Sequence, residues 1–115
     1  MRRIGMVFCS VLVVTSCAMA TEISSTLRSE MAPTGKLRVG LNYGNNLLVV
    51  SMTPEPRGVA PDLGRELGRR LGVPVEFVGY DSAGKLGDGV RTGAWDVAFL
   101  GNEPQRAAEI GRAHV

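Results

Sequence analysis

Short apolar runs alternate with longer stretches of mixed polarity along this chain, and this pattern predicts strands and helices in turn. Three runs are typical of strands: residues 36–41, 74–80 and 95–100. Between them, residues 61–71 and 83–92 predict helices, and a third helix should begin at Pro104. Because strand and helix alternate, we expect an α/β fold with a mostly parallel sheet flanked by helices.

The first predicted helix has clear boundaries. Pro61 suits the first helical position, and Gly72 should end the helix. Leucines spaced four residues apart predict one buried stripe: Leu63, Leu67 and Leu71. Gly64 and Gly68 each cost ~1 kcal/mol relative to alanine inside a helix, but small residues would let the helix lie close to a sheet.

The second predicted helix begins in a segment that resembles a phosphate-binding loop. Residues 79–85 fit the first seven positions of that motif, but Leu86 replaces the hydroxyl residue that should hold magnesium. The sequence therefore argues against nucleotide binding and leaves Lys85 as a solvated helix residue. Asp81 or Ser82 is a suitable N-cap, and Gly93 should end the helix.

Composition limits the classes of function. With 44% hydrophobic and 21% charged residues, the 115-residue chain has the make-up of a folding domain. Without Arg2, Arg3 and Arg112, ten basic residues face eleven acidic ones, so no cationic surface for nucleic acid remains. The single histidine, His114, excludes a catalytic triad and a histidine-rich metal site. We expect no enzyme activity, no metal and no cofactor.

The N-terminus has the features of an export segment. Arg2 and Arg3 precede an apolar run that is too short to span a bilayer, and a small-x-small cleavage site ends at Ala20. Residues 14–17 also resemble a lipobox, which would leave a lipidated Cys17 as the mature N-terminus. Residues 1–20 are thus predicted to be a signal peptide, and the location periplasmic or extracellular. Both cysteines lie in this segment, so no disulfide is expected in the folded part.

A candidate ligand site lies where the third strand meets the third helix. The apolar run ends at Gly101, and Arg106 falls in the first turn of the predicted helix. A guanidinium at such a position is suited to a carboxylate. Ligands of open parallel sheets bind beyond the carboxyl ends of the strands, which here also include residues 42–45 and Tyr80. Trp95 could stack on a ligand, but a tryptophan entering a buried strand is more often part of the core.

Five segments together resemble one protein family. They are residues 36–40, 57–63, 71–78, 91–97 and 104–107, in this order and spacing. From residue 35 to residue 109 the chain resembles part of the first lobe of the bacterial extracellular solute-binding proteins of family 3, the amino-acid receptors of ABC importers. The resemblance implies a periplasmic-binding-protein type II-like fold, in which two lobes close on a ligand.

The resemblance also implies roles for particular residues. Arg106 matches the arginine that holds the ligand carboxylate, and Gly101 and Asn102 match backbone N–H donors. The loop after the first strand would add Asn42, Tyr43 and Asn45 to the pocket. In many members hydroxyl residues precede the arginine, whereas here residues 101–103 are Gly-Asn-Glu. The group for the ligand amine would lie in a second lobe, so a partial first lobe should bind poorly.

The remaining expectations concern the ends of the chain and its partners. Residues 21–34 are polar and should form an irregular linker, and residues 110–115 match one reading frame of a sequencing adapter. We expect a monomer that captures an amino acid or similar small carboxylate and delivers it to an ABC permease. Two alternatives share the fold: a periplasmic cyclohexadienyl dehydratase-like enzyme, and the sensor lobe of a membrane receptor.

Overall fold

The computed structural model describes residues 23–110. The helices and strands are, in chain order, α1 Ser25–Met31, β1 Leu37–Asn42, α2 Val59–Leu71, β2 Val75–Tyr80, α3 Ala83–Thr92, β3 Val97–Ala98 and α4 Pro104–Ile110. The predicted signal peptide, Cys17 and residues 111–115 lie outside the described residues. None of the helices between residues 23 and 110 is long and apolar enough to cross a membrane.

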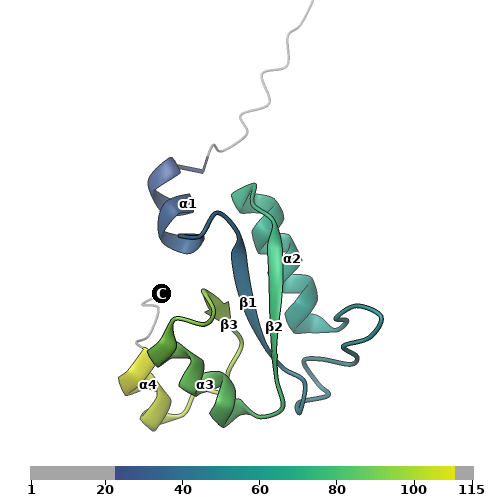
Figure 1. Cartoon of the computed structure of the whole chain (residues 1–115). Helices are drawn as coiled ribbons and strands as arrows, with labels where there is room; N and C mark the ends of the chain where they lie inside the picture. Colours follow the sequence, from purple (N-terminus) through teal and green to yellow (C-terminus); the bar gives the residue numbers. More distant parts are fainter. Residues whose placement is uncertain (1–22, 111–115) are drawn as a thin grey trace, which may run out of the picture.

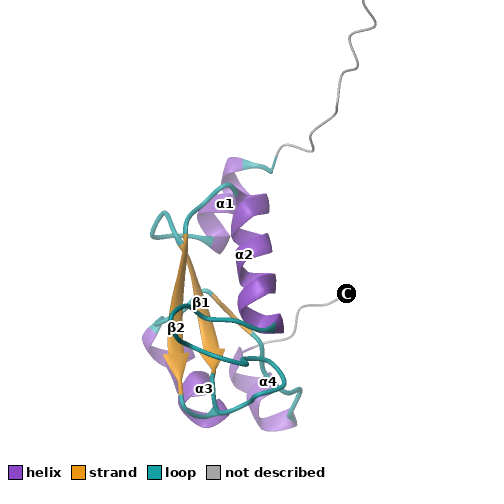
Figure 2. Ribbon diagram, turned by 90° about the vertical axis from the view of Figure 1, so that its right-hand side faces the viewer, coloured by secondary structure: helices purple, strands orange, loops and turns teal. Residues whose placement is uncertain are grey.

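The three strands form a parallel sheet in the order β2-β1-β3 (Figure 1). Leu37 is paired with Val75 at the start of β1, and Asn42 with Tyr80 at its end. α2 packs on one face of this sheet and α3 on the other, while α4 contacts α3. Figure 2 shows the same layers from the side. The predicted α/β fold with a parallel sheet flanked by helices is confirmed.

The core lies between β1 and α2. Side chains of a strand point alternately to its two faces, so Leu37, Val39 and Leu41 share the face toward α2. All three are fully buried, and Leu71 of α2 packs in the same cluster. Gly40 faces the other way. A Cβ at Gly40 would lie 2.5 Å from Cδ1 of Leu86, so the missing side chain lets α3 approach the sheet closely.

α2 differs from the prediction at its start and in its buried face. The helix begins at Val59, so Pro61 occupies the third helical position. The predicted leucine stripe is wrong at Leu63, which is 49% exposed. Gly64 and Gly68 are buried in its place, and a Cβ at Gly64 would lie 2.9 Å from Cγ1 of Val39. The glycines thus let the backbone of α2 lie directly on the sheet, as their small size suggests.

Two further elements differ from the predicted ones. β3 contains two residues where six were expected, and it pairs with β1 alone. The stretch expected to be irregular contains α1, which Ser24 caps by accepting a hydrogen bond from the Leu27 amide at 3.1 Å. Arg28 ties this helix to the domain, because its Nε donates to the carbonyl of Leu71 at 2.8 Å. α3 agrees with the prediction at both ends, with Ser82 as N-cap and Gly93 as C-cap.

Candidate functional site

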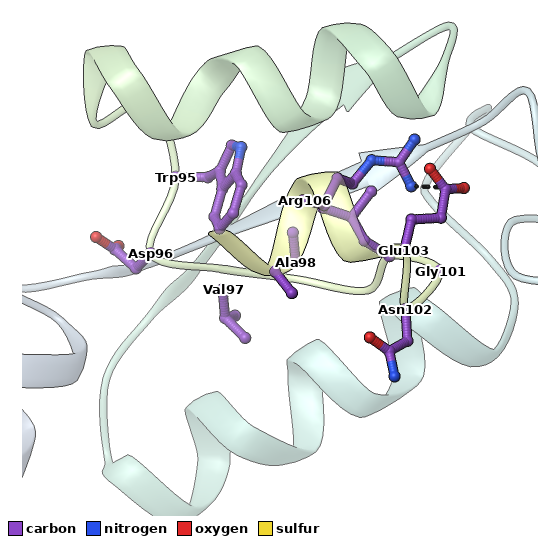
Figure 3. A pocket seen from close by; sticks show the side chains of 10 residues that line it. Trp95, Asp96, Val97, Ala98, Gly101, Asn102, Glu103 and Arg106 are labelled. Atoms are coloured by element: carbon purple, nitrogen blue, oxygen red, sulfur yellow. Dashed lines mark ion pairs between the residues drawn. The ribbon is translucent and has the colours of Figure 1, made fainter. Parts of the chain in front are cut away.

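A cavity of about 350 Å³ lies along β3 and continues into the loop that leads to α4 (Figure 3). Its apolar walls come from both ends of this segment: Val97, Ala98, Leu100 and Ala107. Its polar lining includes Asn102, Glu103 and Arg106. Figure 3 shows Trp95 directed toward α3 and Val97 directed toward α2. Because β3 is an edge strand of the described sheet and lines the cavity, the cavity lies at that edge.

Arg106 holds its guanidinium at the mouth of this cavity. Its side chain is 22% exposed, and Nη1 lies 3.2 Å from Oε1 of Glu103, whose side chain is 55% exposed. The side chain of Arg106 passes α3 at Gly87, where an added Cβ would lie 3.8 Å from Nε of Arg106. Gly101 lies beside both charged groups, since a Cβ there would be 3.8 Å from Glu103 Oε1 and 3.9 Å from Arg106 Nη1.

The ion pair between Arg38 and Asp96 forms a second charged group beside this cavity, which Asp96 lines. Arg38 donates twice to the Asp96 carboxylate, from Nη2 at 2.7 Å and from Nε at 3.1 Å. The Arg38 amide adds a third hydrogen bond at 2.8 Å. Burial works against the ionised form of Asp96, but these hydrogen bonds outweigh it, so the pKa of Asp96 is lowered. Asp96 lines the cavity, yet its charge is already neutralised by Arg38.

The structure brings some of the predicted site residues together and leaves others apart. Gly101, Asn102 and Arg106 line the cavity side by side. Asn42, Tyr43 and Asn45 do not line it; Asn42 ends β1, and Tyr43 and Asn45 lie in the turn that follows. In that turn Asn42 Oδ1 accepts from the Gly44 amide at 3.0 Å, and Asn45 Oδ1 accepts from the Leu47 amide at 3.1 Å. Tyr43 is 47% exposed, and its amide donates to the Tyr80 carbonyl at 2.9 Å.

Trp95 packs against α3 and the sheet, the role that its position at the start of a strand favours. Its indole Nε1 donates to the carbonyl of Leu86 at 2.8 Å, and its ring packs against Gly40 and Gly89. It also lines the cavity. Sequence reasoning did not identify Leu100 and Ala107 as part of the site. The sequence contains a signal for both residues, because Leu100 ends the apolar run and Ala107 follows Arg106.

A second cavity, of about 520 Å³, lies between the loop after β1 and the first turns of α2. Its charged residues are Glu55, Arg57, Asp62 and Arg65. Two positive and two negative side chains leave no net charge, and Arg65 already pairs with Asp62 at 3.1 Å. Within residues 23–110 no group of three or more His, Cys, Asp or Glu side chains is arranged to hold a metal ion.

The comparisons with known proteins yield one informative likeness. No family model matches the chain, and no curated protein matches it in sequence. Among solved structures, the chain is similar to the Ancestral Cationic Amino Acid Solute Binding Protein (AncCDT-1), with 27% sequence identity and a TM-score of 0.60. The match covers 71% of this chain and 37% of that protein, so the chain spans little more than a third of its length. The fold is therefore similar to that of a periplasmic binding protein, and the likeness supports a binding role.

Proposed function

We propose that this chain forms one wall of the binding site of an exported solute-binding protein, which captures an amino acid or related small carboxylate for an ABC importer. The observation that carries this proposal is Arg106, a half-buried guanidinium at the mouth of a 350 Å³ cavity. The similarity in fold to an amino-acid-binding protein supports it further. The proposal includes export by residues 1–20 and delivery of the ligand to a membrane permease.

In this proposal Arg106 binds the carboxylate of the ligand. Arginine presents five N–H donors in a planar fork, and within residues 23–110 only Glu103 forms an ion pair with it, through a single oxygen. Donors therefore remain for a second carboxylate. The backbone of Gly101 and Asn102 borders the same space and would complete the contact. Asn42, Tyr43 and Asn45 would contribute from the neighbouring turn, at the carboxyl edge of the sheet.

The experiment is a titration of the ¹⁵N-labelled chain with L-leucine, followed by amide chemical shifts. Residues 101–103 are exposed, so a ligand bound beside them still faces water. We therefore expect weak, millimolar binding. The shifts should concentrate in residues 95–107, with smaller ones in residues 42–45. Replacing Arg106→Ala should weaken binding about tenfold or more, because hydrogen bonds to charged groups contribute ~1.5–3 kcal/mol.

A matched control removes an arginine that lies elsewhere. Arg69 on α2 is 71% exposed and pairs with Glu66 at 2.7 Å, so Arg69→Ala should leave the titration unchanged. Unaltered far-ultraviolet circular dichroism would show that both variants fold. A chain that binds L-leucine equally well with and without Arg106 would contradict the proposal, as would shifts that saturate outside residues 42–45 and 95–107. Micromolar binding would contradict the expected openness of the site.

A further inference from the structure

We propose that Glu103 receives the ammonium group of the ligand, so that the site selects zwitterionic amino acids over simple carboxylates. This inference rests on the proposed function, because it concerns the same cavity and the same arginine. It adds a second recognition element, three residues before Arg106 in the sequence. The resemblance to the solute-binding family does not supply this role, since it places the group for the ligand amine in a second lobe and has hydroxyl residues before the arginine in many members.

The contact between Glu103 and Arg106 leaves both groups able to bind more. It joins one guanidinium nitrogen to one carboxylate oxygen at 3.2 Å, longer than the ~2.7–2.9 Å typical of charge-assisted hydrogen bonds. Arg38 and Asp96 provide the contrast in the same cavity. There two side-chain contacts, at 2.7 and 3.1 Å, and a backbone amide occupy three of the about four acceptor sites of the carboxylate. Of the two acidic groups that line the cavity, Glu103 therefore keeps the greater capacity to accept a further donor.

The charges of the pair match those of an amino acid. An amino-acid zwitterion carries its ammonium and its carboxylate on the same carbon atom, and Glu103 and Arg106 present the opposite charges at contact distance from each other. A ligand laid across the pair places each of its charges against the opposite one. A simple carboxylate meets Arg106 well but also meets the like charge of Glu103, which disfavours it. The ligand side chain would then lie on the apolar wall of Leu100 and Ala107.

Three probes that share the isobutyl side chain separate the two charges: L-leucine, 4-methylpentanoate, which lacks the ammonium, and 3-methylbutylamine, which lacks the carboxylate. In amide-shift titrations of the wild-type chain we expect L-leucine to bind about threefold more tightly than 4-methylpentanoate, the range of a partly exposed ion pair. The variant Glu103→Gln should remove this preference and retain binding of 4-methylpentanoate. Glu76→Gln, at a carboxylate that pairs with Lys36 away from the cavity, should keep the preference.

The outcomes distinguish failure of this inference from failure of the proposed function. Equal binding of L-leucine and 4-methylpentanoate to the wild-type chain, both lost in Arg106→Ala, would overturn the role of Glu103 and keep the carboxylate site. A preference that persists in Glu103→Gln would also overturn it. Absence of shifts with all three probes would overturn the proposed function itself. The comparison of probes on the wild-type chain needs no variant, so a Glu103→Gln chain that failed to fold would leave the test decisive.

Discussion

The close contact between α2 and the sheet predicts an unusual response to alanine at Gly64. In an exposed helix interior, replacing glycine with alanine stabilises the helix by ~1 kcal/mol. At Gly64 the new Cβ would lie 2.9 Å from Val39 Cγ1, 3.1 Å from Val39 Cγ2 and 3.3 Å from Phe77 Cε1. Val39 is fully buried and β-branched, so it has little freedom to rotate away.

The steric cost decides the sign of this effect. Overpacking a well-packed core costs typically ~1–3 kcal/mol, which exceeds the gain in helix propensity. We therefore expect Gly64→Ala to lower the free energy of unfolding by about 1 kcal/mol. Gly84→Ala is the matched control: Gly84 is also a helical glycine, but nothing stands within 4 Å of its added Cβ. This variant should be more stable than wild type by ~0.5–1 kcal/mol.

Urea denaturation measures both changes. The chain has one tryptophan, Trp95, whose indole contacts α3 and the sheet, so its fluorescence reports on tertiary structure while circular dichroism reports on the helices. We expect the two variants to differ by about 2 kcal/mol, with Gly84→Ala the more stable. A Gly64→Ala chain as stable as Gly84→Ala would refute the direct contact of α2 with β1.

Two further predictions concern an ion pair and a helix cap. Because the pKa of Asp96 is lowered in the folded chain, its ionised form stabilises the fold above the unfolded pKa of about 3.9, and this contribution is lost as pH falls through the lower folded pKa. The urea midpoint should therefore fall less steeply below about pH 4 in Asp96→Asn than in wild type. The control Asp62→Asn, at an exposed side chain, should keep the wild-type decline. Identical acid profiles for wild type and Asp96→Asn would count against the ion pair. Ser82 Oγ accepts from the Lys85 amide at 3.3 Å, so Ser82→Ala should cost about 1 kcal/mol of unfolding free energy, measured as a lower Tm, and an unchanged Tm would argue against this cap.

Local chemistry explains why most elements could be predicted from the sequence. Gly72 and Gly93 end their helices because both adopt positive φ, of 69° and 60°, which glycine tolerates best. Ser82 supplies the side-chain oxygen that a helix N-terminus needs. These signals depend on neighbouring residues in the chain, so they are readable without knowing what packs against them. The placement of Arg106 after the last apolar run is of the same kind.

Tertiary contacts decided what the local signals could not. Periodicity assigned Leu63 to the buried face of α2. In the structure Gly64 and Gly68 face the sheet instead, because only small residues allow the backbones of α2 and the sheet to approach so closely.

Asp96 and Glu103 both lie close to β3 in the sequence, but Asp96 is neutralised by Arg38, 58 positions earlier in the chain, whereas Glu103 pairs with Arg106 through one contact at 3.2 Å. The sequence by itself thus determined the order of the elements from β1 to α4 and the arginine that could meet a ligand. Which carboxylate keeps acceptor capacity beside that arginine was decided by pairing between distant strands, because parallel strands bring together residues that local patterns cannot relate.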